Sequence, residues 1–147
     1  MKLMVTGSRT YDNAVHIADI FGKVERKHGV GNLTLIHGAA RGADTLCARE
    51  ALTRGWSVEA HPADWDRKPD GSINRAAGHH RNSRMIGRQP DAVLAFFQPG
   101  ERNAGTRGAM LLAVRKNIPI VCFWGTEKCT PDQIVDYLEA SNPPQAG

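Results

Sequence analysis

Short apolar runs alternate with longer amphipathic stretches along most of this chain. The apolar runs predict five strands, at Lys2–Thr6, Leu33–His37, Trp56–Ala60, Ala92–Phe97 and Pro119–Phe123. The stretches after them predict helices, at about Asn13–His28, Ala43–Arg54, His79–Gln89, Arg107–Asn117 and Thr130–Ala140. Apolar strands separated by helices are typical of a parallel sheet that is covered on both faces. We therefore predict an α/β fold with a five-stranded parallel sheet.

The same pattern indicates one domain over residues 1–140, followed by a polar tail at 141–147. Asp12 or Asn13 is a suitable cap for the first helix, and Thr130 for the last. The segment His61–Gly78 breaks the pattern, because it contains Pro, Gly and charges and has no usable period. It is longer than an ordinary connection, so it is either a functional lid or a loose insertion.

Composition narrows the class of protein. The chain has 147 residues and a net charge of +4, which favours anionic partners. No apolar run approaches the roughly 20 residues of a membrane span, and the start has no signal-peptide pattern. The three cysteines, Cys47, Cys122 and Cys129, have no metal-site spacing and are odd in number. We expect reduced thiols in a cytoplasmic protein, with no metal, no certain cofactor and no membrane partner.

The first candidate binding segment is Gln98–Thr106, QPGERNAGT, between the fourth strand and its helix. Gly105 lets the backbone approach a ligand closely, and Thr106 is a good helix N-cap. The free N–H groups of a first helical turn favour a phosphate. An ordinary capped turn is the alternative that this loop alone leaves open.

The second candidate follows the first strand, which commonly lies where strand order reverses. It comprises Gly7, Ser8, Arg9 and Thr10. The hydroxyl groups can donate to a phosphate, and Arg9 can pair with it through two bonds. A tight turn with an exposed arginine is the alternative.

The third candidate follows the second strand and opens a helix. Its candidate residues are Gly38, Ala39, Arg41, Gly42 and Asp44. Small residues there allow backbone amides to form a nest for an anion. Asp44 falls in the first helical turn, where it stabilises the helix or binds a ribose hydroxyl group.

The fourth candidate is the basic segment His79–Met85, HHRNSRM. Arg81 and Arg84 lie three residues apart, so they can share one helix face and grip a phosphate or carboxylate. We expect Arg81 to lie at the surface, so that its loss weakens binding and spares folding. Asn82 is expected to serve the helix start. A solvated basic face is the alternative.

Together these residues carry a family resemblance. LMVTGSRTY, LIHGAARGAD, HPADW, RNSRM and DAVLAFFQPG…GT resemble, in this order, the SLOG superfamily and most of all its small YspA-like members. That superfamily also holds the phosphoribohydrolases that activate cytokinins and the DNA-processing protein A of transformation. The resemblance implies a Rossmann-like three-layer α/β/α fold of strand order 3-2-1-4-5. It also implies a nucleotide-type ligand over the carboxyl edge of the sheet.

The resemblance also assigns roles to residues. It places Gly7, Ser8 and the segment Gly38–Asp44 in binding loops, Arg81 at a phosphate or ribose, and Pro99, Gly100, Gly105 and Thr106 in the last phosphate loop. The phosphoribohydrolases carry glutamates shortly after Gly-Thr that help to break the N-glycosidic bond. Here Gly108 and Ala109 stand at those positions. Any hydrolysis would need another acid, such as Glu101, Asp44 or Asp64.

Three functions follow as alternatives. The first is binding or sensing of ADP-ribose, an NAD derivative or a nucleoside phosphate. The second is hydrolysis of an N-glycosidic bond in such a ligand. The third is binding of single-stranded nucleic acid, for which Tyr11, Trp65 and Trp124 are the aromatic side chains available for stacking. A homo-oligomer, a dimer or larger, is also expected.

Overall fold

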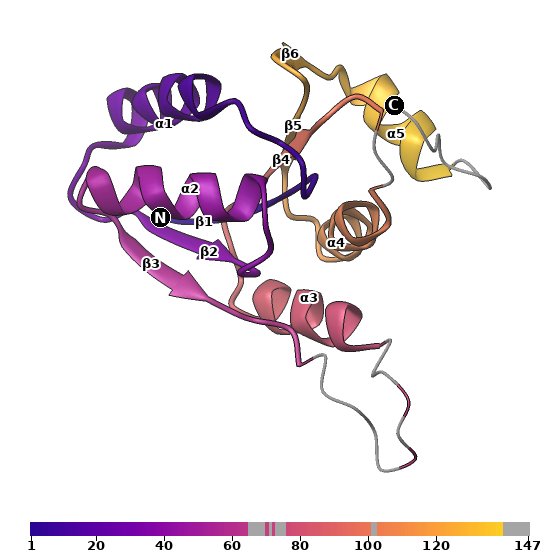
Figure 1. The fold of residues 1–147 in the computed structure, drawn as a ribbon. Coiled ribbons are helices and arrows are strands. Elements are labelled where there is room, and N and C mark those ends of the chain that lie inside the picture. The colour runs from indigo at the N-terminus through magenta and orange to yellow at the C-terminus, as the bar shows by residue number, and fades with distance from the viewer. Residues whose placement is uncertain (65–69, 71, 73–75, 101–102, 140–147) are drawn as a thin grey trace.

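The computed structural model describes residues 1–64, 70, 72, 76–100 and 103–139. Within these residues the strands are β1 (Lys2–Gly7), β2 (Thr34–His37), β3 (Ser57–Ala60), β4 (Ala92–Phe97), β5 (Ile120–Trp124) and β6 (Glu127–Lys128), as Figure 1 shows. The helices are α1 (Ala14–His28), α2 (Ala43–Thr53), α3 (Ala77–Gly87), α4 (Ala104–Arg115) and α5 (Pro131–Glu139).

All six strands belong to a single sheet of order β3-β2-β1-β4-β5-β6. The first five are parallel, which confirms the predicted order 3-2-1-4-5. The sixth strand was not predicted, because Glu127–Lys128 is short and polar. It returns antiparallel to β5 through a tight turn at Gly125, whose φ is +63°.

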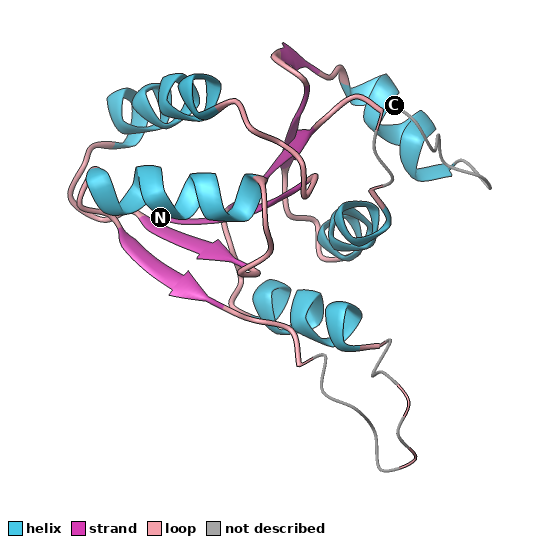
Figure 2. Ribbon diagram, in the orientation of Figure 1, coloured by secondary structure: helices cyan, strands magenta, loops and turns pink. Residues whose placement is uncertain are grey.

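Helices cover both faces of the sheet, so the fold has the predicted three layers (Figure 2). On one face α1 and α2 cover a core that includes Phe21, Leu35 and Phe96. On the other face α3 and α4 pack against the sheet, and α5 lies beyond α4 near β5 and β6. Cys47 is buried in the core under α1 and α2, and Cys122 is buried on the other face, beside α4 and α5.

Several predicted helix boundaries need correction. α3 begins at Ala77 instead of His79, and α4 begins at Ala104, ahead of the predicted cap at Thr106. The first and last helices start as predicted. Asn13 accepts a hydrogen bond from the His16 amide, and Thr130 accepts one from the Gln133 amide.

Some predictions fall on residues that the structure does not describe. These include Glu101, Trp65, the tail at 141–147 and much of the segment His61–Gly78. Among the described helices, none has the length and apolar character that a membrane span requires.

Candidate functional site

The ends of β1, β2 and β4 meet at one edge of the sheet. Gly7, the last residue of β1, is in register with Phe96 of β4, and the Ser8 amide donates to the Phe96 carbonyl over 2.9 Å. The Ser8 carbonyl accepts the amide of Ala43, the first residue of α2. A side chain at Gly7 would collide with the Phe96 carbonyl and with Ala43, so this junction requires glycine.

A cavity of about 270 Å³ opens above this junction, and we call it the polar cavity. It is bordered by residues from β1, from the start of α2, from α3 and from the start of α4. They are Thr6, Gly7, Ser8, Arg9, Ala40, Asp44, Arg81, Asn82, Met85, Asn103, Ala104, Gly105 and Thr106. Four segments that are far apart in the sequence therefore converge, as the candidate loops predicted.

The loop after β2 is organised by Asp44. One oxygen of its carboxylate accepts the amides of Gly38, over 2.9 Å, and of Ala40, over 3.3 Å. The Ala39 amide donates to Nδ1 of His37 over 3.0 Å. Backbone amides that the sequence suggested for an external anion are thus used by the protein's own side chains. Asp44 holds the loop in shape instead of only stabilising its helix.

The ionisation of Asp44 is unusual for a carboxyl group. Its side chain is buried, and this burial raises the pKa of Asp44 to about 6, against the lowering effects of the two amides and of Arg81. A carboxyl group with such a pKa titrates close to neutrality. Burial has the opposite effect on a histidine, so the pKa of His37 is lowered and its ring is neutral at pH 7.

The position of Arg81 differs from the predicted one. The side chain is buried, with 9% of its surface exposed, although the surrounding segment is charged. Its Nη1 donates to the Gly38 carbonyl over 2.5 Å, and its Nε donates to Oδ1 of Asn82 over 2.9 Å. The expectation that Arg81 lies at the surface is therefore wrong, and the reason for expecting its loss to spare folding no longer holds. Arg81 ties α3 to the loop after β2 and still borders the polar cavity.

Asn82 links α3 to the next helix. Its Nδ2 donates to the carbonyl of Gly105 in the first turn of α4, over 3.1 Å. Thr106, also in that turn, shares a hydrogen bond of 3.3 Å with the hydroxyl group of Thr6. Thr106 is therefore not the N-cap, which is Asn103. The first N–H groups of a helix have no acceptor within the helix, and here that turn borders the cavity.

Asn103 is a site residue that the sequence reasoning missed. It is buried, and its Oδ1 accepts the Ser8 hydroxyl group over 2.5 Å. The same hydroxyl oxygen accepts the Gln98 amide over 2.8 Å. Asparagine is a favoured N-cap residue, so its position just before Ala104 was an available signal. Ser8 thus positions the loop that precedes α4.

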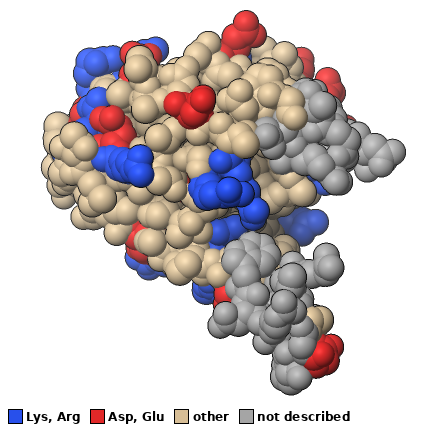
Figure 3. All heavy atoms as spheres, viewed as in Figure 1, with Lys and Arg blue, Asp and Glu red and all other residues tan. Residues whose placement is uncertain are grey.

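A second cavity of about 270 Å³ adjoins the polar cavity, and we call it the arginine cavity. Arg9, Ala40 and Arg81 border both cavities. The arginine cavity is completed by Gly38, Ala39, Arg41, Pro62 and Ala63. Arg9 and Arg41 are exposed. Figure 3 shows basic side chains gathered near the middle of the viewed face.

Other predicted residues do not border either cavity. They are Thr10, Gly42, Pro99 and Gly100. Gly42 has a φ of +77° and packs against the carbonyls of Ser8 and Arg9, so its role is to shape the loop. The guanidinium group of Arg107 donates to the Leu138 carbonyl of α5.

Two of the three aromatic side chains proposed for stacking nucleic-acid bases, Tyr11 and Trp124, are described, and both are poorly placed for it. Tyr11 is buried against Phe96 and hydrogen-bonded to His16. Trp124 packs against Phe97 at a centroid distance of 5.4 Å. Among the described residues there is also no group of three or more His, Cys, Asp or Glu side chains able to hold a metal ion.

Comparison with known proteins places this architecture in a family. Residues 1–67 match the model of the family described as YspA, cpYpsA-related SLOG. The chain is 33% identical over 127 residues to the Gene 61 protein of Mycobacterium phage D29, covering 83% of this chain and 95% of that protein.

Two solved structures are similar in fold only. DNA processing protein A from Streptococcus pneumoniae matches with a TM-score of 0.49 and 18% identity, over 84% of this chain and 59% of that one. UDP-GlcNAc 2-epimerase from Neisseria meningitidis, bound to UDP-GlcNAc, matches with a TM-score of 0.48 and 20% identity, over 84% of this chain and 32% of that one. This chain therefore spans less than two thirds of either protein. The family match and the phage relative together show that the chain belongs to the YspA, cpYpsA-related SLOG family.

Proposed function

We propose that this protein binds a nucleotide-type ligand at the polar and arginine cavities. The candidate ligands are ADP-ribose, an NAD derivative and a nucleoside phosphate. Family membership implies nucleotide-related binding in general. We extend that general expectation to these particular ligands.

The observation that carries the proposal is the charge around the two cavities. Arg9 and Arg81 border both, and Arg41 borders the arginine cavity. Among the described lining residues the only carboxylate is Asp44, and its Oδ2 is bonded to two backbone amides. Arginine pairs with phosphate through charge-assisted hydrogen bonds. An anionic ligand is the partner that such a lining favours.

The start of α4 supports the same assignment. Ala104, Gly105 and Thr106 form its first turn and border the polar cavity. The helix dipole and the free N–H groups of a first turn favour a negatively charged group. The space beside Gly105 is open, since a side chain there would meet no atom within 4 Å. A phosphate can therefore approach this turn closely.

The presence of two adjoining cavities favours a ligand with two parts. Each cavity has a volume of about 270 Å³, and they share Arg9 and Arg81. A ligand of the ADP-ribose type places phosphates between two sugars, and so fits phosphate groups at the shared arginines. We therefore rank ADP-ribose and NAD derivatives above a mononucleotide.

A thermal-shift experiment tests the proposal. ADP-ribose, NAD, AMP and cyclic dinucleotides are added separately to the protein, with adenosine as the control that lacks phosphate. We expect stabilisation by at least one phosphate-bearing compound and none by adenosine, because binding to the folded state raises the midpoint of unfolding. No stabilisation by any compound, or equal stabilisation by adenosine, would contradict the proposal. Mass spectrometry under native conditions then identifies the bound compound.

A second candidate function is hydrolysis of the N-glycosidic bond of such a ligand. It is favoured by Asp44, a cavity-lining carboxyl group whose pKa of about 6 suits acid–base catalysis near neutrality. Glu101 is the alternative acid, and it lies outside the described residues. Chromatography of protein incubated with AMP, NAD and ADP-ribose would detect free base after multiple turnovers. Turnover that is lost in Asp44→Asn or in Glu101→Gln, with binding retained, would identify the acid.

A further inference from the structure

The hairpin of β5 and β6 places two cysteines opposite one another. Its register pairs Phe123 with Lys128 and Trp124 with Glu127, so Cys122 and Cys129 occupy the next opposed position. The Cys129 amide donates to the Cys122 carbonyl over 2.8 Å. Opposed side chains of an antiparallel pair lie on the same face of the sheet. Both thiols therefore face the same side, toward α5.

The spacing of such a pair suits a disulfide. Hydrogen-bonded pairs in antiparallel sheets have Cα atoms about 5.5 Å apart, and disulfides span Cα distances of about 4.4–6.8 Å. Both thiols are free in this structure. The Cα spacing typical of such a pair therefore falls within the range that a disulfide spans.

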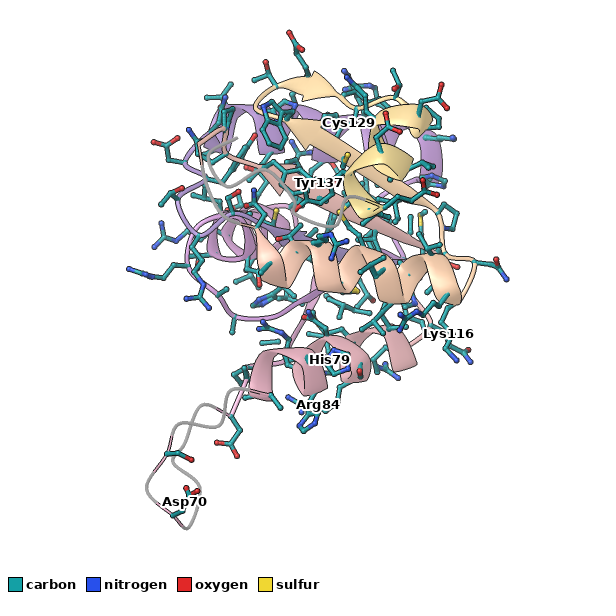
Figure 4. All side chains as sticks on the ribbon, turned by 90° about the vertical axis from the view of Figure 1, so that its right-hand side faces the viewer. Asp70, His79, Arg84, Lys116, Cys129 and Tyr137 are labelled. Carbon is teal, nitrogen blue, oxygen red and sulfur yellow. The ribbon has the colours of Figure 1, made fainter. Side chains whose placement is uncertain are left out.

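The two thiols also share a cavity. This cavity, which we call the apolar cavity, has a volume of about 290 Å³. It is bordered by Phe97, Met110, Cys122, Trp124, Glu127, Lys128, Cys129, Gln133, Ile134 and Tyr137. Figure 4 shows Cys129 and Tyr137 close together at this end of the molecule. Cys47 belongs to the core on the other face of the sheet, so it does not compete with either thiol.

The two thiols differ in access. Cys129 is half-buried and Cys122 is buried. Burial, together with hydrogen bonding to Cys129, raises the pKa of the Cys122 thiol. Since the thiolate is the reactive form and access is required, an oxidant in solution reacts first at Cys129. Cys122 then lies next to the oxidised sulfur.

We propose that Cys122 and Cys129 form a modification site at which a hydroperoxide produces an intramolecular disulfide. In the first step the Cys129 sulfur attacks the peroxide O–O bond, giving a sulfenic acid and releasing the alcohol, or water when the oxidant is hydrogen peroxide. In the second step the Cys122 sulfur attacks the Cys129 sulfur, and the S–OH oxygen leaves as water. Two thiols are oxidised and one peroxide is reduced. This site lies at the apolar cavity and does not depend on nucleotide binding.

Tryptic mapping without reduction tests the proposal. Lys128 lies between the two cysteines, so trypsin separates residues 117–128 from residues 129–147. After treatment with hydrogen peroxide we expect these peptides to remain joined, and to separate when dithiothreitol is added. The intact chain should lose two hydrogens in mass and remain a monomer on a non-reducing gel.

Two variants provide matched controls. Cys129→Ser should abolish the joined peptides, whereas Cys47→Ala should retain them, because Cys47 lies across the sheet. In Cys122→Ser the sulfenic acid on Cys129 should persist and react with dimedone. Separate peptides in the peroxide-treated wild-type protein, with Cys129 oxidised alone, would overturn the proposal. So would a disulfide that joins two chains.

Discussion

The polar cavity and the apolar cavity have almost equal volumes and differ in what borders them. The polar cavity, of about 270 Å³, lies where β1, α2, α3 and α4 meet. The apolar cavity, of about 290 Å³, lies where β4, β5, β6, α4 and α5 meet. The first is bordered by buried polar side chains that bond to one another, and the second mostly by rings, thiols and aliphatic groups, together with the exposed Glu127, Lys128 and Gln133. Volume alone therefore does not distinguish a binding site from a gap between packed elements.

The two linings differ in the free-energy cost of burying their side chains. Buried polar groups must be hydrogen-bonded, and leaving one without a partner costs about 1–3 kcal/mol. Ser8 with Asn103, and Arg81 with Gly38, show how the polar cavity meets this requirement. A protein that needed only to pack these helices would place apolar side chains there. The polar lining is thus the stronger indication of a ligand.

The largest effect is expected in the apolar cavity, from Phe97→Ala. Phe97 is buried between Trp124 and Tyr137. Its truncation should lower the free energy of unfolding by about 3–5 kcal/mol, measured by urea denaturation. The affinity of the folded protein for ADP-ribose should be unchanged. A variant that keeps its stability and loses ligand binding would reverse the roles assigned to the two cavities.

The next effect concerns Asp44 and depends on pH. Its pKa rises from 3.8 to about 6 on folding, so the folded state holds the proton more tightly than the unfolded chain. The resulting stability is present below about pH 4 and is lost as the pH rises through about 6. The free energy of unfolding of the wild type, minus that of Asp44→Asn, should fall by roughly 2–3 kcal/mol between about pH 4 and about pH 7. Urea titrations of both proteins at several pH values measure it, and a difference that is flat or rises with pH would exclude a raised pKa.

A smaller effect is expected for Arg9→Gln, and it should appear in binding only. Arg9 is exposed and borders both the polar and the arginine cavity. Loss of a phosphate contact should weaken ADP-ribose binding by about 1.5–3 kcal/mol. The free energy of unfolding should change by less than about 0.5 kcal/mol. Isothermal titration calorimetry and urea denaturation give the two values.

Arg84→Gln is the matched control for this variant. Arg84 is exposed on α3, projects outward in Figure 4, and donates to the Pro62 carbonyl without bordering either cavity. Its replacement should leave ADP-ribose affinity unchanged. Equal losses in Arg9→Gln and Arg84→Gln would point to the general positive charge of the protein instead of a defined site.

The smallest expected effect distinguishes a mononucleotide, such as AMP, from a ligand that fills both cavities, such as ADP-ribose. Arg41 borders the arginine cavity and not the polar cavity. Arg41→Gln should weaken ADP-ribose binding by roughly 1 kcal/mol and leave AMP binding unchanged. The control is Arg49→Gln. Arg49 is an exposed arginine of α2, on the same side of the sheet as Arg41. Equal weakening of both ligands would place them in one cavity.

The sheet was predictable because each parallel strand is an apolar run. Ala92–Phe97 and Ile120–Trp124 are almost entirely apolar, and the order of the parallel strands followed from the family resemblance. β6 was not predictable, since two polar residues leave no periodic signal. Helix starts were less certain, because both Asn103 and Thr106 are good caps and only packing selects between them.

The loops that form the candidate site were predicted from the sequence, but the hydrogen bonds within it were not. The convergence of Gly7, Asp44, Arg81 and Gly105 was foreseen. The burial of Arg81 was not, because a charged segment predicts a solvated face until the Gly38 carbonyl is known to lie beside it. Asp44 likewise was expected to stabilise the helix start or to bind a ribose hydroxyl group, whereas its contacts run back to the preceding loop. Such contacts depend on tertiary placement, which local patterns do not encode.

Chemical-shift mapping of the backbone amides tests the central claim, that the polar and arginine cavities take the ligand. The ¹⁵N-labelled protein is titrated with ADP-ribose, and the amide signals are followed in both regions. We predict that the signals of Gly7, Arg41, Gly105 and Thr106 move together and saturate, while those of Glu127 and Ile134 at the apolar cavity stay in place. Saturating shifts confined to Glu127 and Ile134 would contradict it, as would an absence of shifts throughout.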